Sequence, residues 1–409
     1  MKNTIQRLTL LFLFTITTVV SQHVKHYNGN VQIDAKNHIL KANFTINFNS
    51  LPRENTMKFF IHRATTGLKV QSGNRSIKTT ILDEEFVEKD HAITFKTSSI
   101  KNKKVQIAYT LHLDSLSNNG FKFHKDWIEL NLYTAWYPIN TKYGRFPYTV
   151  TTSIDDGYKL FGSGNVDNIN GKWKINQTIN SIDISQVFYK NSSKATIGKI
   201  ELFYININKL AAEKIKSNTK SHFEFLNSWL GKTGSSTKLM LAVSNLKHTT
   251  SYARKNFISL SVAKNYSEPY DKILAHELGH LWWNKANVTN WEEWLNESFA
   301  EYTAIIAQRR LFGEQNFTKN INRLQKRTEK LASPYKLEKD VDNYQNSVTY
   351  KGAYFLHELE NKIGRKEFAK FLTKVHKSKI KFTKDLLDLL EVTYGKETAM
   401  FLLQKLANN

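Results

Sequence analysis

The sequence predicts a two-domain protein: an N-terminal all-β domain of antiparallel sheets, forming a sandwich or saddle, followed by a helix-rich α+β domain. Apolar and polar residues alternate with period two up to about residue 205, which is typical of half-buried strands. From residue 209 onward the apolar residues recur with helical spacing. No internal repeat or low-complexity linker marks the change, so we expect domains at 22–205 and 206–409.

The strands expected in the first domain share this alternation and are separated by turn residues such as Asn28-Gly29 and Asn170-Gly171. They are residues 31–33, 42–48, 92–95, 105–109, 127–137, 148–154 and 199–207. This domain contains no recognisable catalytic motif.

The second domain is expected to begin with a helix and then to alternate briefly with strands. The predicted strands are residues 238–243 and 257–262. The predicted helices are residues 210–230, 273–283, 294–311, 353–363, 368–375 and 386–406.

The first 21 residues have the layout of a secretory signal. Lys2 and Arg7 precede a mostly apolar run over 8–20, and Ser21 supplies a small residue at the end. The run is shorter than the roughly 20 residues that span a bilayer, although an uncleaved anchor is an alternative. No later segment is long and apolar enough to cross a membrane. We therefore expect an exported protein of the periplasm, cell surface or extracellular space.

Composition limits the possible chemistry. The chain has no cysteine, so thiolate nucleophiles, disulfides and Cys-ligated metals are excluded. Lys and Arg number 59 against 36 Asp and Glu, a formal charge of +23. These cations are scattered without aromatic interleaving, which favours a solvated basic face over nucleic-acid binding. Attraction to anionic cell-surface polymers or acidic substrates is a weaker alternative.

Residues 276–280 read HELGH within a predicted helix. At 3.6 residues per turn, His276 and His280 project from one face a turn apart and can share one zinc ion. Glu277 lies about 100° further round, where it can take a proton from an attacking water. Gly279 weakens a helix unless another element must approach closely there. The alternative interpretation is two surface histidines on a charged helix.

A tetrahedral zinc site with one open position needs a third protein ligand. Residues 294–300, WLNESFA, follow the pentad. Together, HELGHLWW at 276–283 and this segment resemble the zinc signature of the aminopeptidase N family of gluzincin metallopeptidases. The resemblance implies a thermolysin-like zinc peptidase domain behind a β domain. It implies His276, His280 and Glu297 as zinc ligands and Glu277 as general base.

The third ligand has rivals. Sixteen residues separate His280 from Glu297, fewer than is usual in the family, and we expect the loop at 285–290 to absorb the difference. Glu293 and Glu301 are the alternative ligands. Glu301 lies one turn beyond Glu297 and could instead hydrogen-bond a ligand histidine, or be a solvated carboxylate.

The family normally carries a Gly-x-Met-Glu-Asn segment whose Glu grips the free amino terminus of the substrate. The corresponding stretch here, TSYARKNFISL at 250–260, contains no acid. Arg254 and Lys255 have the wrong charge to bind an amine. We expect Arg254 to pair with a substrate carboxylate or carbonyl, or to be a basic loop residue.

The transition-state tyrosine of the family normally precedes a Lys-Gly pair with one residue between them. Here Thr349 occupies that position and Tyr350 directly precedes Lys351. Tyr350 is the first candidate to hydrogen-bond the oxyanion, with Tyr344 second, and a structural role for Tyr350 is the alternative. His357 is expected to be a packed or surface histidine.

The sequence therefore predicts an exported zinc-dependent peptidase with one Zn²⁺ per chain, acting on peptides or proteins and not on nucleic acid. The resemblance implies an aminopeptidase, but the missing acid leaves exopeptidase and endopeptidase action open. A non-catalytic, zinc-retaining binding protein of the cell envelope is the alternative, and a structural zinc site in an unrelated helical protein is a weaker one. A glycosylation-type triplet at Asn296 overlaps the metal helix, which, with the absence of cysteine, favours a bacterial source.

Overall fold

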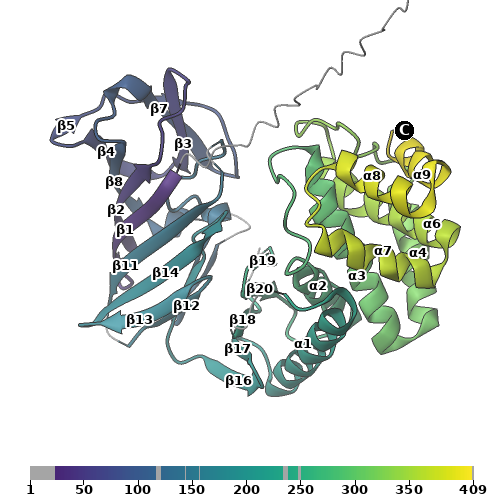
Figure 1. The fold of residues 1–409 in the computed structure, drawn as a ribbon. Helices are drawn as coiled ribbons and strands as arrows, with labels where there is room; N and C mark the ends of the chain where they lie inside the picture. The colour runs from purple at the N-terminus through teal and green to yellow at the C-terminus, as the bar shows by residue number, and fades with distance from the viewer. Residues whose placement is uncertain are drawn as a thin grey trace, which may run out of the picture.

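The computed structural model describes residues 24–116, 121–142, 144–155, 157–233, 238–246 and 250–407. Over these residues a β-rich domain lies beside a domain of one sheet and many helices (Figure 1). This arrangement confirms the predicted fold class. The predicted signal segment, 1–21, lies outside the described residues.

The N-terminal domain is built from antiparallel strand pairs with one parallel exception. Its eight-stranded sheet contains β1 (Val24–Asp34), β2 (Ile39–Phe48), β4 (Thr65–Ser72), β5 (Arg75–Ser76), β8 (Lys104–His112), β11 (Phe146–Ile154), β13 (Asn165–Ile169) and β14 (Lys172–Ser181). The order is β13-β14-β11-β1-β2-β8-β4-β5, and β1 runs parallel to β11.

Two smaller sheets complete this domain. One contains β9 (Lys122–His124), β10 (Trp127–Leu130), β12 (Lys159–Gly162) and β15 (Gln186–Tyr189), and the other β3 (Thr56–His62), β6 (Thr80–Leu82) and β7 (Asp90–Lys96). Period-two patterning accounts for the core: along β2, Leu40, Phe44 and Ile46 are buried while Lys41 and Asn43 are exposed.

The second domain has its own five-stranded sheet in the order β16-β17-β18-β20-β19. These strands are β16 (Ser193–Ile197), β17 (Ile200–Ile205), β18 (Leu239–Ser244), β19 (Tyr252–Arg254) and β20 (Phe257–Ser261). The pairing corrects the domain boundary expected at residue 205, because β16 and β17 belong to the second domain's sheet. Alternation identifies a strand but does not say which sheet it joins.

The helices of the second domain follow, apart from α1, which connects β17 to β18. They are α1 (Lys209–Leu230), α2 (Glu268–Gly279), α3 (Trp294–Phe312), α4 (Glu314–Thr328), α5 (Tyr344–Asn346), the π-helix η5 (Ser347–Lys351), α6 (Gly352–Ile363), α7 (Arg365–Lys377), α8 (Thr383–Tyr394) and α9 (Lys396–Ala407).

Two details of these helices differ from the prediction. The single helix expected at 386–406 is two helices, because Gly395 has a φ of +87° and ends α8. Helix α4 was not predicted, although Phe317, Ile321 and Leu324 recur at helical spacing and are buried.

The two domains share a small apolar core. Trp127, Phe161 and Val187 of the first domain pack against residues of the second domain's sheet, among them Phe203 and Phe257. The rings of Phe161 and Phe203 stack with centroids 4.3 Å apart. This shared core fixes the β domain against the sheet that leads into the metal centre.

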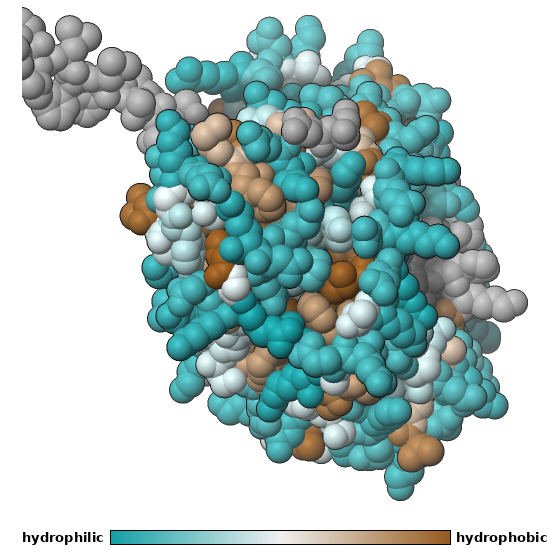
Figure 2. Space-filling view, turned by 90° about the vertical axis from the view of Figure 1, so that its right-hand side faces the viewer, coloured by the Kyte–Doolittle hydropathy of each residue, from teal (hydrophilic) through white to brown (hydrophobic). Residues whose placement is uncertain are grey.

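The helical side of the molecule is mostly hydrophilic, with apolar side chains scattered among polar ones (Figure 2). None of the helices in the described part of the chain combines the length and the apolar character needed to cross a membrane.

Candidate metal centre

Close packing of α2 on α3 brings the histidine pair and the acidic helix together. Leu274 and Leu278 of α2 are fully buried in the core of the second domain. A Cβ placed on Gly279 would lie only 3.1 Å from Cα of Ala300 in α3. Glycine therefore favours this close helix contact, as the sequence suggested.

The loop between these helices is fixed by a side chain beside the predicted third ligand. The Asn296 side chain accepts a hydrogen bond from the backbone N–H of Ala286 and donates one to its carbonyl. Asn296 is buried, and its two hydrogen bonds hold the middle of the loop, at Ala286, against α3. These hydrogen bonds explain how a short loop still allows Glu297 to lie next to the two histidines.

Among the described residues, His276, His280 and Glu297 form a group whose ligand atoms all lie within 4.8 Å of one another. The two Nε2 atoms are 3.2 Å apart. Glu297 Oε2 lies 3.5 Å from Nε2 of His276, and Oε1 lies 3.6 Å from Nε2 of His280. The predicted convergence of these three side chains is therefore present.

The hydrogen bonds behind the imidazoles indicate what this group can hold. Nδ1 of His276 lies 3.1 Å from Oε2 of Glu301, and Nδ1 of His280 lies 3.2 Å from the carbonyl of Trp283. Because both partners are acceptors, the Nδ1 atoms carry the protons and the Nε2 lone pairs face each other. Two lone pairs and a carboxylate that face one another can coordinate a metal cation.

The spacing fits zinc. Two nitrogen ligands at Zn–N distances of about 2.0–2.1 Å in a tetrahedral arrangement would lie roughly 3.3–3.4 Å apart. The observed 3.2 Å is close to this value. The donor set of two imidazoles and one carboxylate is that of a catalytic zinc site with an open position.

The carboxyl groups of the site differ in their pKa values. Burial raises the pKa of Glu277 to about 7. Burial also acts to raise the pKa of Glu297, but His280 and His276 outweigh it and lower the pKa to about 2. Glu297 is thus the carboxylate suited to a metal, and Glu277 the one suited to gaining and losing a proton.

Glu301 lies behind His276 and not among the three converging groups. Its other oxygen forms an ion pair with Lys272, and the side chain is 4% exposed. This geometry is that of a carboxylate that orients a ligand imidazole, and the role remains a prediction. The sequence analysis did not identify Lys272 as part of the site. Its position one helical turn before His276 was the signal that could have indicated it.

Glu293, the other rival ligand, is turned away from the histidines. Its Oε2 lies 3.2 Å from Nζ of Lys339 and 3.4 Å from the hydroxyl of Tyr344. The second tyrosine candidate is therefore tied to this acid. Burial raises the pKa of Glu293 to about 7.

The π-helix η5 brings two hydroxyl residues to the site. It packs tightly on α3, where Ser298 Oγ donates a hydrogen bond of 2.5 Å to the carbonyl of Val348. Thr349 Oγ1 lies 3.5 Å from Oε2 of Glu297. Tyr350 lines the same cleft, with its ring 3.5 Å from the guanidinium carbon of Arg327. Interruptions of this kind in a helix are frequent at functional sites.

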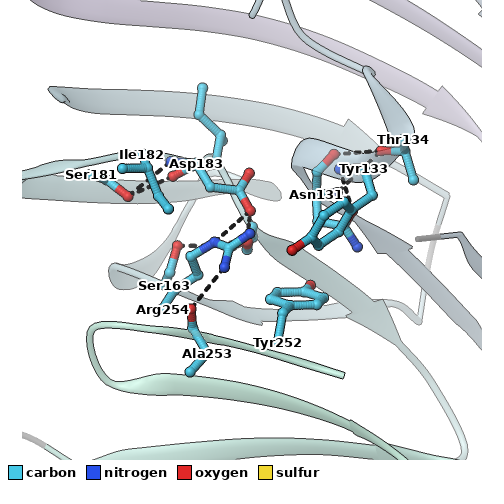
Figure 3. Close-up of polar contacts among 12 residues, drawn as sticks. Asn131, Tyr133, Thr134, Ser163, Ser181, Ile182, Asp183, Tyr252, Ala253 and Arg254 are labelled. Atoms are coloured by element: carbon cyan, nitrogen blue, oxygen red, sulfur yellow. Dashed lines mark hydrogen bonds and ion pairs between the residues drawn. The ribbon is translucent and has the colours of Figure 1, made fainter. Parts of the chain in front are cut away.

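Arg254 is placed differently from the expectation of a substrate contact. Its Nε donates a hydrogen bond of 2.8 Å to Asp183 of the first domain, and Nη1 bonds to the carbonyl of Ala253 (Figure 3). Its guanidinium lies 4.7 Å from the ring centre of Tyr252 and 5.8 Å from that of Tyr133. Arg254 is buried at the domain seam and is not among the residues lining the cleft, so a substrate role remains a prediction.

A second buried ion pair lies at the same seam, between strands β9 and β10 of the first domain, and is hydrogen-bonded to the second domain. Lys122 Nζ lies 3.6 Å from Glu129 Oε1 and donates a hydrogen bond to Ser259 of β20. Tyr252 donates a hydrogen bond of 2.9 Å to the same Glu129 oxygen. Both charged side chains are fully buried, and no sequence motif indicated them.

His357 is a packed histidine, as expected. Its Nδ1 lies 3.1 Å from the hydroxyl of Tyr302, and its Nε2 lies 3.2 Å from Nδ2 of Asn361. It is not part of the converging group.

A cleft of about 890 Å³ opens from the metal centre. His276, Glu277 and Glu297 line one part of it, and α4 lines another. The arrangement is that of a metal-dependent hydrolase, with ligands, an adjacent carboxylate and a cavity for substrate.

Comparison with known proteins agrees with this class. Residues 245–405 match the Peptidase family M1 domain. A 139-residue stretch is 30% identical to Aminopeptidase M1-B of Oryza sativa subsp. japonica, and it covers 30% of this chain and 16% of the rice protein. The matched stretch is therefore a small part of that relative.

Solved structures show the same fold over nearly the whole chain. The M1 zinc metallopeptidase from Deinococcus radiodurans superimposes with a TM-score of 0.71 at 15% identity, covering 94% of both chains. Yeast LTA4 hydrolase superimposes with a TM-score of 0.70 at 16% identity, covering 94% of this chain and 68% of its own.

Fold and site together define a gluzincin-type zinc metallopeptidase. Residues 245–405, within its second domain, carry the match to the peptidase family M1 domain, and solved M1 structures share its fold. Zinc is the cofactor that the family and these structural neighbours indicate.

Proposed function

We propose that this chain is an exported, zinc-dependent peptidase that hydrolyses peptide bonds with an activated water. The single observation that carries the proposal is the convergence of two Nε2 atoms and a carboxylate, with Glu277 next to His276 and lining the same cleft. A bound zinc ion would polarise the scissile carbonyl and acidify the attacking water.

In this proposal His276, His280 and Glu297 hold the metal, and Glu301 orients the ring of His276 by accepting a hydrogen bond from its Nδ1–H group. Glu277 accepts a proton from the water and later donates it to the leaving amine. A carboxyl with a pKa near 7 can do both at neutral pH. The hydroxyl of Tyr350 is the candidate donor to the oxyanion.

Substrate recognition is proposed to differ from that of an aminopeptidase in which a glutamate binds the free amino group of the substrate. Strand β19 and the residues after it contain Arg254 and Lys255, and the segment 250–260 contains no acid. A cationic amine would gain nothing from these side chains. We therefore propose a peptidase that does not depend on a free amino terminus.

Export to the periplasm, cell surface or extracellular space, in a bacterial source, is part of the proposal. It rests on the positive start and short apolar run of residues 1–21 and on the absence of cysteine.

A panel of short peptides with free and with acetylated amino termini tests the function, using full chain with one equivalent of zinc. Cleavage of both kinds with similar kcat/KM is expected, and Glu277→Gln should lower kcat by roughly 10³-fold with zinc still bound. Cleavage restricted to free amino termini would contradict the proposed recognition.

The alternative is a non-catalytic protein that retains zinc. It is favoured by one observation: Thr349, not a tyrosine, is the η5 hydroxyl nearest Glu297. The alternative would be supported if zinc-loaded wild-type protein cleaved none of the peptides faster than the Glu277→Gln variant does.

A further inference from the structure

The cleft that contains the metal centre has one wall made by α4. Arg323, Leu324 and Arg327 of this helix line it, as do Tyr350 and the metal-binding residues His276 and Glu297. Arg323 and Arg327 are one helical turn apart, so both reach the cavity from the same helix face.

The two arginines lack carboxylate partners. No hydrogen bond or ion pair joins Arg323 to any other of the described residues. Arg327 donates a hydrogen bond of 3.0 Å to Asn346 Oδ1 and lies 3.5 Å from the ring centre of Tyr350. Both side chains are exposed to solvent. Within the described part of the chain, their charge is therefore not neutralised by any acid.

Four acids line the cleft: Glu277 lies next to His276 in the chain, and the other three are already engaged. Glu268 pairs with Lys319 at 3.5 Å, and Glu301 pairs with Lys272. Glu297 belongs to the three converging groups. A substrate lying against α4 thus meets two guanidinium groups and no free carboxylate on that wall.

We propose that the α4 wall binds a carboxylate of the substrate, so that this cleft selects acidic peptides. Guanidinium groups form paired, charge-assisted hydrogen bonds with carboxylates, and a second unpaired arginine one turn away extends the site. The inference rests on the proposed peptidase function and names its substrate class.

The carboxylate would lie near the scissile bond. Arg327 is in contact with Tyr350, and the neighbouring Thr349 hydroxyl is 3.5 Å from Glu297. Since an extended peptide advances about 3.3–3.6 Å per residue, the carboxylate belongs to a residue a few positions from the cleaved bond. It is either a side chain of Asp or Glu or the terminal carboxylate of a short peptide.

Arg323→Ala in the full chain is the first test. With acidic peptides it should raise KM and lower kcat/KM about five- to tenfold, leaving kcat nearly unchanged, because an exposed charge pair contributes modestly. With the matched neutral peptides, kcat/KM should change less than about twofold. Asp→Asn peptides and C-terminally amidated peptides distinguish a side-chain carboxylate from a terminal one.

Lys326→Ala provides the matched control. Lys326 is a cation on the same helix but does not line this cleft. It should leave both kinds of peptide unaffected. Equal losses of kcat/KM for acidic peptides in the Arg323 and Lys326 variants would mean that only the overall positive charge matters, and would overturn the proposal.

Charge reversal at Arg323 should increase activity toward basic peptides, an increase that a folding defect cannot produce. Arg323→Glu should shift preference from acidic peptides toward the corresponding lysine peptides by about tenfold or more. An unchanged ratio between acidic and basic peptides would overturn the carboxylate site.

Binding to the zinc-loaded Glu277→Gln variant separates this inference from the proposed function. A labelled acidic peptide should bind more tightly than its amide counterpart, and Arg323→Ala should remove the difference. If wild type cleaves nothing but this difference is found, the peptidase proposal fails and the carboxylate site stands. If wild type cleaves but no difference is found, the carboxylate site fails alone.

Discussion

The two sides of the cleft are built in different ways. On the metal side, α2 and α3 supply short-range features: two histidines a turn apart, an acid between them, and a glycine that permits contact with Ala300. On the recognition side, the segment 250–260 around β19 has no acid where the family pattern has a glutamate, and η5 carries Thr349 where that pattern has a tyrosine.

This difference separates chemistry from recognition. The groups needed to hold zinc and move a proton come from two helices packed in one core. The groups proposed to contact the rest of a substrate come from the π-helix η5 and from α4, which can change without moving the metal ligands. We therefore expect variants on the metal side to abolish activity and variants on the recognition side to alter stability or preference.

The largest effect is expected at the metal. His280→Ala removes one of three protein ligands and should weaken zinc binding by on the order of 10³-fold or more. Metal analysis after dialysis should then find little zinc, while His357→Ala, a packed histidine outside the group, should retain it. Full zinc retention by His280→Ala would break the assignment of the metal side.

A large change in stability is expected at the seam beside β19. Asp183→Ala leaves Arg254 buried without its carboxylate, which costs about 3–5 kcal/mol of unfolding free energy. Burial acts to lower the pKa of Arg254, yet Asp183 raises it, so the guanidinium stays charged. Urea denaturation measures the loss.

The double variant Asp183→Leu with Arg254→Met is the control for that loss. It removes both charges and should recover most of the stability. If it also keeps wild-type kcat/KM, Arg254 has no part in substrate binding. A loss of activity in the well-folded double variant would instead support the predicted substrate role.

Tyr350 offers a sharper test of the recognition side. Tyr350→Phe should lower kcat by roughly 10²-fold with little change in KM, because the hydroxyl acts on the transition state. Tyr344→Phe should have a small effect, since that hydroxyl faces Glu293. A larger effect from Thr349→Val than from Tyr350→Phe would transfer the role to the threonine.

The smallest expected effect concerns the support of the metal. Glu301→Gln should weaken zinc binding by about 10- to 100-fold, because the amide orients the His276 ring less firmly. Competition with a chelator of known affinity measures it. Glu268→Gln, a cleft acid remote from the histidines' nitrogens, is the matched control and should bind zinc as wild type does.

Much of the metal side could be predicted from sequence because its geometry is local. Helix periodicity alone places His276 and His280 together, and Gly279 indicated a close helix contact. The choice of Glu297 over Glu293 and Glu301 depended on the family resemblance, since all three acids lie on or next to one helix. Only the packed structure shows Glu293 against Lys339 and Glu301 behind His276.

The sequence by itself determined the two kinds of secondary structure, the absence of thiol chemistry and the histidine–glutamate pentad. The tertiary structure decided which sheet β16 and β17 join, how Arg254 is paired across the domains, and which cations of α4 face the cleft. The physical reason is the sequence separation of the interactions, because periodicity and helix geometry depend on residues that are only a few positions apart. Sheet pairing, buried ion pairs and cleft walls depend on contacts between residues far apart in the chain.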